Sequence, residues 1–136
     1  MTGKGRILVV DDDPAILDFV SMALSDEGYE VQTAADGRSA LEIIERWPPD
    51  LILLDMRMPI MDGWEFASAY ARRPGHHAPV VVLTAAQDAA GLAREIQAVD
   101  YVAKPFALDD LLRVVAAHTQ RSRDDGRGPA PGQSGG

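Results

Sequence analysis

The stretch LILLDMRMPIMDG, residues 51–63, decides the fold. It opens on four consecutive apolar residues, and a short uninterrupted apolar run is typical of a strand buried on both faces of a parallel sheet. Asp55 follows the run directly, and Pro59 and Gly63 mark a turn that leads into a helix. We therefore expect a strand over residues 51–54 with an aspartate at its carboxyl end, followed by a helix to about residue 72.

Three further apolar runs end in polar residues in the same way. ILVV precedes Asp11 and Asp12, VVVL precedes Thr84, and YVA precedes Lys104. Ligands of open α/β sheets bind at the carboxyl ends of the strands, so these side chains should meet Asp55 at one edge. Crowded carboxylates repel one another unless a cation lies among them, and aspartate oxygens suit Mg²⁺. The pattern predicts phosphoryl-transfer chemistry.

Strands and helices alternate along the whole chain, which predicts an α/β fold with a doubly wound, five-stranded parallel sheet and five helices. Capping residues separate the segments: Asp13-Pro14 supplies a helix N-cap and a proline at the first helical position. The expected strands cover residues 6–10, 29–34, 51–54, 80–83 and 101–103. The expected helices cover about residues 14–27, 36–46, 63–72 and 88–96, and a last helix follows Pro105 to about residue 120.

Length and composition fit one domain. The chain has 136 residues, 46% of them hydrophobic, which is enough for one compact core but hardly for two. We expect a short arm over residues 1–5 and the domain over residues 6–120. Residues 121–136 lack apolar side chains beyond alanine and are predicted to form a disordered tail or the start of a linker. A stand-alone domain is favoured, and an output domain truncated after the tail stays an open alternative.

Charge and residue content exclude several classes of function. The formal net charge is -8, which argues against direct nucleic-acid binding by this domain because phosphate contacts need clustered lysine and arginine. The chain has no cysteine, so disulfides, thiolate metal sites and thiol catalysis are excluded. Neither a signal peptide nor a stretch approaching the roughly 20 apolar residues of a membrane span is present. We therefore expect a cytoplasmic protein without membrane contact.

Four motifs occur in a fixed order: VVDDDPAIL, LILLDMRMPIMDGWE, VVLTA and YVAKPF. As a set they resemble the receiver domain of two-component response regulators, and the resemblance covers about residues 6–118. It implies the flavodoxin-like strand order 2-1-3-4-5. It also implies a single-domain response regulator that is not an enzyme, apart from catalysing its own phosphorylation and dephosphorylation.

The resemblance assigns a role to each strand-end residue. It makes Asp55 the phosphoacceptor, which takes a phosphoryl group from a histidine kinase or histidine phosphotransfer protein in a Mg²⁺-dependent reaction. Asp12 and Asp55 match the direct carboxylate ligands of Mg²⁺, and Asp11 matches an acidic partner that acts largely through water. The backbone carbonyl of Arg57 matches the remaining protein ligand. Lys104 resembles the lysine that pairs with a phosphoryl oxygen.

The resemblance also implies an output. Thr84 resembles the switch hydroxyl that moves toward the phosphoryl group, and Tyr101 occupies the position of the aromatic switch. The fourth and fifth strands and the helices after them would then present a changed face to a downstream protein target, or to a second copy in a phosphorylation-dependent dimer of an otherwise monomeric chain. Arg57 and Ala86 occupy the two variable positions that tune the lifetime of the acyl phosphate.

The chain departs from the family pattern at position 97. Gln97 stands where relatives usually have a glycine, just after the fourth expected helix. A left-handed backbone conformation helps at such a position, so this corner is expected to be rebuilt or strained.

Two other functions remain open. A haloacid-dehalogenase-like phosphatase would use Asp11 as nucleophile and Asp13 as acid/base, although Pro-Ala stands where that motif normally has Gly-Thr and the chain is short for that fold. A degenerate receiver would serve only as a binding module. Asp13 is itself expected to cap a helix, and His76 and His77 are expected to be solvated loop residues instead of metal ligands.

Overall fold

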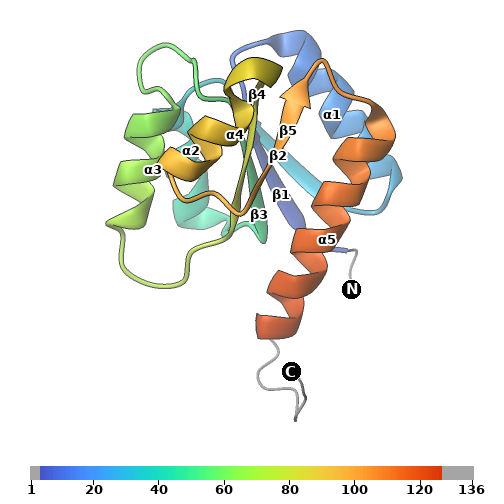
Figure 1. Ribbon diagram of the computed structural model, residues 1–136. Coiled ribbons are helices and arrows are strands. Elements are labelled where there is room, and N and C mark those ends of the chain that lie inside the picture. Colours follow the sequence, from blue (N-terminus) through green and yellow to red (C-terminus); the bar gives the residue numbers. More distant parts are fainter. Residues whose placement is uncertain (1–3, 127–136) are drawn as a thin grey trace.

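Five parallel strands form a single sheet in the order β2-β1-β3-β4-β5 in the computed structural model, which describes residues 4–126 (Figure 1). The strands are β1 (Arg6–Val10), β2 (Glu30–Ala34), β3 (Leu51–Leu54), β4 (Val80–Ala85) and β5 (Asp100–Lys104). The helices are α1 (Pro14–Asp26), α2 (Gly37–Arg46), α3 (Gly63–Ala71), α4 (Ala86–Glu95) and α5 (Leu108–Gly126). The predicted fold class and strand order are confirmed.

Each face of the sheet has its own layer of helices (Figure 1). Side chains alternate between the two faces along a strand, and in β3 all four residues are fully buried. Ile52 and Leu54 pack with α2, α3 and α4, whereas Leu51 and Leu53 pack with α1 and α5. Burial on both faces explains why β3 is a continuous apolar run.

Aspartates start three of the helices at the carboxyl edge of the sheet. Asp13 accepts a hydrogen bond from the Ala15 N–H and has Pro14 after it, as predicted for an N-cap. Asp36 caps α2, and Asp62 caps α3 in a reciprocal capping box with Glu65. These caps fix where each helix begins relative to the strand ends.

The last helix is longer than predicted. α5 continues to Gly126, whereas the sequence predicted that the helix ends at about residue 120 and that a tail or linker begins at residue 121. No proline interrupts this stretch, and arginine is a good helix former, so the helix propagates until the glycine. Residues 127–136, for which a disordered tail or linker was also predicted, lie outside the described residues. Among the helices of residues 4–126, none has the length and apolar character needed to cross a membrane.

The backbone is strained at the corner after α4. The helix begins at Ala86, two residues earlier than predicted, and ends at Glu95. Gln97 then has a φ of +60°, a left-handed conformation that glycine adopts without steric cost. Of the two predicted outcomes, a strained corner is therefore the one observed. A non-glycine residue held in this region costs on the order of 1 kcal/mol.

Candidate functional site

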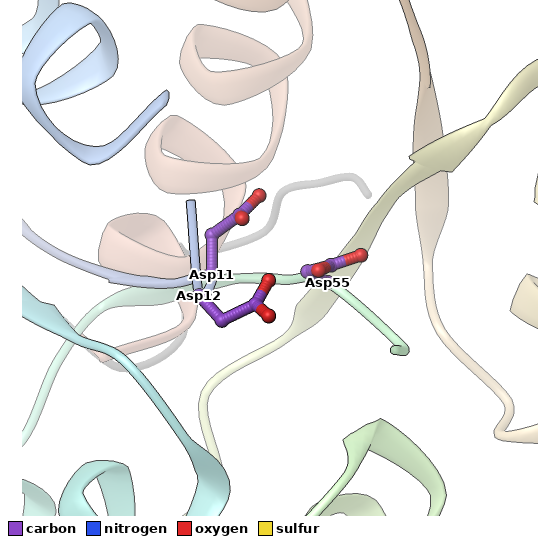
Figure 2. A group of neighbouring side chains, drawn as sticks. All are labelled: Asp11, Asp12 and Asp55. Atoms are coloured by element: carbon purple, nitrogen blue, oxygen red, sulfur yellow. The ribbon is translucent and has the colours of Figure 1, made fainter. Parts of the chain in front are cut away.

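Three carboxylates meet at the carboxyl edge of the sheet (Figure 2). Asp11 and Asp12 follow β1 and Asp55 follows β3, and one oxygen of each lies within 4.8 Å of the others. The pairing of β1 with β3, in which Val10 lies opposite Leu54, brings the two strand ends together. Asp11 is fully buried and Asp55 is 6% exposed, whereas Asp12 faces solvent. The structure thus gathers the carboxylates that the sequence predicted to converge.

Backbone hydrogen bonds fix the two buried aspartates. The Asp55 N–H donates to the Val10 carbonyl at 2.8 Å, and the Asp11 N–H donates to the Ala34 carbonyl at 3.0 Å. Both bonds continue the sheet one residue past the strands. The Asp13 N–H also donates to Asp11 Oδ1 at 2.9 Å, which orients that carboxylate. The site is therefore built on rigid elements.

Lys104 brings a positive charge into the site from the end of β5. Its Nζ donates to Asp11 Oδ2 at 2.7 Å and lies 3.8 Å from Asp55 Oδ1. Charge-assisted hydrogen bonds of this length are the stronger ones, so the lysine mainly neutralises Asp11. Asp55 is left with the weaker share of this charge.

The pKa of Asp55 is raised from 3.8 to about 6. Burial of the carboxylate is the main cause, and the negative charge of Asp11 is the second. Lys104 and a hydrogen bond from the Arg57 backbone N–H act in the opposite direction but only partly offset the rise. Bringing a cation to this oxygen cluster would relieve the repulsion.

The donor set fits a hard divalent cation. Asp11, Asp12 and Asp55 supply only oxygen atoms, and two of the three residues are buried where an uncompensated charge is costly. Mg²⁺ is usually bound through one or two carboxylates and keeps several waters, and Asp12 leaves this cluster open to solvent. Lys104 alone does not balance three carboxylates.

Residues 7–116 match the family model described as the response regulator receiver domain. The chain belongs to this family. Response regulator MprA of Mycolicibacterium vanbaalenii is 44% identical over 90% of this chain and 54% of its own length. The DNA-binding response regulator MtrA of Mycolicibacterium smegmatis is 37% identical over 91% of this chain and 54% of its own length.

The receiver fold also matches a solved structure. A response regulator receiver domain protein described as CheY-like, from Methanospirillum hungatei, is 34% identical, with a TM-score of 0.76 over 88% of this chain and 97% of that chain. This chain spans about half the length of the curated relatives that it matches. Family membership therefore applies to the receiver domain alone, and it does not establish the activity of the full-length relatives for this chain.

Two further residues of the receiver lie on the neighbouring strands. Thr84 is buried near the end of β4, opposite Ala103 of β5. Tyr101 lies opposite Val82 and is 42% exposed, so its ring is not part of the core. Thr84, the expected switch hydroxyl, and Tyr101, the expected aromatic switch, thus lie on adjacent strands.

The Arg57 side chain does not point into the cluster of aspartates. Its guanidinium pairs with Asp88 of α4 at 3.5 Å and lies over the ring of Trp64. Sequence reasoning considered the Arg57 backbone and a tuning role, and it did not foresee these contacts. Asp13 caps α1 as predicted, whereas His77, which was expected to be solvated, packs edge-on against Tyr70 with its Nε2 buried.

An apolar groove of about 440 Å³ borders the site, lined by Ile16, Phe19, Lys104, Pro105 and Phe106. The rings of Phe19 and Phe106 lie 6.2 Å apart and join α1 to the segment after β5. Sequence reasoning missed this groove. The available signal was Phe19, an aromatic residue outside the inner stripe of Leu17, Val20 and Leu24 on α1.

The raised pKa of Asp55 predicts that the metal-free protein loses stability against unfolding as the pH rises. The folded chain binds this proton more tightly than the unfolded chain, so the associated stability is present below pH 3.8 and is lost as the pH rises through about 6. Without metal, Asp55→Asn should therefore gain stability relative to the parent by on the order of 2 kcal/mol between pH 4 and pH 7. Urea unfolding of both proteins across this range, in chelator, measures the difference. A difference that does not change with pH would contradict the assignment.

Proposed function

We propose that this receiver domain accepts a phosphoryl group on Asp55 from a phosphohistidine of a histidine kinase or histidine phosphotransfer protein. The observation that carries the proposal is the cluster in which the buried Asp55 lies beside Asp11, Asp12 and Lys104. Membership of the receiver family supports it. A pKa of about 6 also leaves most of Asp55 ionised at neutral pH, which a nucleophile requires.

In the proposed transfer, one oxygen of Asp55 forms a bond to phosphorus while the bond from phosphorus to the donor's imidazole nitrogen breaks. That nitrogen keeps the bonding electron pair, and the imidazole leaves neutral because its other nitrogen carries a proton. Lys104 Nζ, which lies 3.8 Å from Asp55 Oδ1, would donate to a phosphoryl oxygen. The products are an acyl phosphate on Asp55 and a free histidine on the donor.

Asp11, Asp12, Asp55 and the backbone carbonyl of Arg57 would hold the Mg²⁺ in this proposal. When bound, the ion supplies positive charge near the phosphoryl oxygens. The oxygen-only donor set and the surplus of negative charge in the cluster support this assignment.

The apolar groove is the proposed docking site for the protein that donates the phosphoryl group. Lys104 both lines the groove and contacts Asp11, so a partner seated there would lie beside Asp55. Nonpolar side chains of that partner would cover Phe19, which is 49% exposed, and the half-buried Phe106, and aromatic residues of this kind are enriched in protein–protein interfaces.

The groove predicts a difference between protein and small-molecule donors. Phe19→Ala should slow transfer from a phosphohistidine protein by about tenfold, because a buried aromatic contact of this kind is worth more than 1 kcal/mol. The rate with phosphoramidate should change much less, since that donor needs no groove. Met22→Ala is the matched control, because Met22 is exposed on the same helix and does not line the groove. Equal slowing by both variants, or by neither, would refute the docking site.

The proposed output is a change in β4, β5, α4 and α5. Thr84 and Lys104 lie at the ends of β4 and β5, and each can gain a contact with a phosphoryl dianion on Asp55. Tyr101 lies three residues before Lys104 and is exposed in this structure, so a change in its rotamer would alter the surface.

Removing the Thr84 hydroxyl should separate phosphorylation from output. In the parent, beryllofluoride with Mg²⁺ should shift amide signals from Thr84 through Leu112 more than signals near α2. Thr84→Ala should keep phosphorylation but lose most of the distant shifts, and Thr84→Ser should restore them because it keeps the hydroxyl. NMR spectra of the three proteins test this. A Thr84→Ala response equal to that of the parent would rule out the switch.

The charge of the domain bears on its partners. A net charge of -8 supports contacts with proteins instead of direct nucleic-acid binding by this domain. We propose a cytoplasmic domain that is a monomer, or a dimer when phosphorylated, and that passes its signal to a downstream protein without enzymatic activity beyond its own phosphorylation and dephosphorylation.

Incubation with phosphoramidate separates this function from its two alternatives. A receiver should take up one phosphoryl group per chain with Mg²⁺ and none with chelator, and it should not turn over generic phosphomonoesters. A haloacid-dehalogenase-like phosphatase would hydrolyse phosphomonoesters repeatedly. A degenerate receiver would do neither. Mass spectrometry of the intact chain and a phosphate-release assay distinguish the three outcomes.

A further inference from the structure

Two side chains from the segment after β3 contact the two ends of α4. Arg57 Nη2 lies 3.5 Å from Asp88 Oδ2, and Asp88 is the third residue of the helix. The Trp64 Nε1–H donates to Glu95 Oε1 at 2.8 Å, and Glu95 is the last residue of the helix. α4 is thus tied at both ends to the β3–α3 segment.

Arg57 and Trp64 also contact each other. The guanidinium carbon of Arg57 lies 5.7 Å from the centroid of the Trp64 ring, within the range of a cation–π interaction. The contacts therefore run without a break from Asp88 through Arg57 and Trp64 to Glu95. We refer to these four residues as the α4 clamp.

α4 has little local stability of its own. Ala85 at its N-cap position makes no side-chain cap hydrogen bond, and Gly91 interrupts the middle of the helix. Immediately after the helix, Gln97 is held at a φ of +60°. A helix with these features depends on contacts to neighbouring elements, so loss of the clamp should loosen it.

The Arg57 end of the clamp is the end that a phosphoryl group can compete for. Arg57 follows Asp55 by two residues, and its side chain is 66% exposed while that of Asp88 is 37% exposed. Exposed ion pairs of this kind contribute no more than about 1 kcal/mol, so this pair breaks easily. A phosphoryl dianion on Asp55 offers three acceptor oxygens and a larger charge than Asp88 does.

We propose that Trp64, oriented by Glu95, is a positioning residue that holds Arg57 on Asp88 in the unphosphorylated chain, and that a phosphoryl group on Asp55 draws Arg57 away and frees α4. The release step rests on the proposed function, whereas the holding step does not. This route to α4 runs through side chains on the α3 side of the aspartate cluster, and it acts in addition to the switch at Thr84, which carries most of the distant response.

The holding step is tested without any phosphoryl group. Hydrogen exchange of the α4 amides should become about two- to fivefold faster in Trp64→Phe, Glu95→Gln and Asp88→Asn, which corresponds to the loss of an exposed pair. Because Trp64 acts on Asp88 through Arg57, the double variant of Trp64 and Asp88 should show less than the sum of the two single effects. Glu45→Gln is the matched control. Glu45 Oε2 lies 3.3 Å from Arg73 Nη2 in an exposed ion pair that does not involve α4, and the substitution removes the charge of that pair. Unchanged α4 exchange in Trp64→Phe, or full additivity, would overturn the holding step.

The release step is tested with beryllofluoride and Mg²⁺. The chain has two tryptophans, so Trp64→Phe assigns the indole N–H signals directly. In the parent, the Trp64 indole signal should shift while that of Trp47 stays, and α4 exchange should rise to about the level of Asp88→Asn. Shifts around Asp55 with an unmoved Trp64 signal and unchanged α4 exchange would overturn the release step. No shifts around Asp55 would overturn the proposed function and the release step together, while the first experiment still decides the holding step.

Discussion

Asp55→Asn should abolish covalent phosphorylation. The other carboxylates of the cluster are poor substitutes, because Asp11 is buried and hydrogen-bonded to Lys104, and Asp12 faces solvent and would be occupied by the proposed Mg²⁺. With phosphoramidate and Mg²⁺, intact-mass spectrometry should find one added phosphoryl group on the parent and none on the variant. An amide oxygen at position 55 is too weak a nucleophile to replace the carboxylate.

A matched aspartate on the same edge of the sheet controls for this change. Asp36 follows β2 and caps α2 by accepting from the Ser39 N–H, and asparagine caps a helix as well as aspartate does. Asp36→Asn should therefore take up the phosphoryl group like the parent. Full labelling of Asp55→Asn would show that another residue is the acceptor.

Asp12→Ala should lower the affinity for Mg²⁺ by more than tenfold, which is about 1.4 kcal/mol or more. The substitution removes a charged ligand from a cluster of three carboxylates. It also removes repulsion, so the metal-free variant should be more stable than the parent. Titration calorimetry with Mg²⁺ and thermal unfolding in chelator measure the two effects.

Asp13→Ala separates the metal effect from simple loss of an acidic residue. Asp13 is the exposed neighbour of Asp12, and its carboxylate accepts from the Ala15 N–H at the start of α1. This variant should keep its Mg²⁺ affinity and lose about 1 kcal/mol of stability, the usual cost of a lost N-cap. If Asp12→Ala instead behaved like this control, Asp12 would be a structural residue.

The sequence predicted the sheet and the meeting of the carboxylates for a physical reason. Parallel strands buried on both faces need continuous apolar runs, and the first polar residue after each run must lie at the same edge. Asp11, Asp12 and Asp55 follow this rule in the structure. The strained corner at Gln97 was also foreseeable, because a helix end that favours glycine leaves few other conformations.

Contacts between side chains could not be predicted in this way. Lys104 was expected beside a phosphoryl group, and only the structure places its Nζ on Asp11. The hydrogen bond from Trp64 to Glu95 likewise depends on how α3 and α4 lie beside each other. Periodicity assigns a residue to one face of its own helix or strand. These contacts depend instead on the rotamers of two side chains and on the relative position of the two elements that carry them.

Borohydride reduction of the phosphorylated parent tests most directly whether Asp55 carries the phosphoryl group. Borohydride reduces an acyl phosphate and converts that aspartate to homoserine, which peptide mass spectrometry locates. After treatment with phosphoramidate and Mg²⁺, we expect homoserine at position 55 and unmodified aspartate at positions 11, 12 and 13. Homoserine at any of those three positions, with Asp55 unchanged, would contradict it.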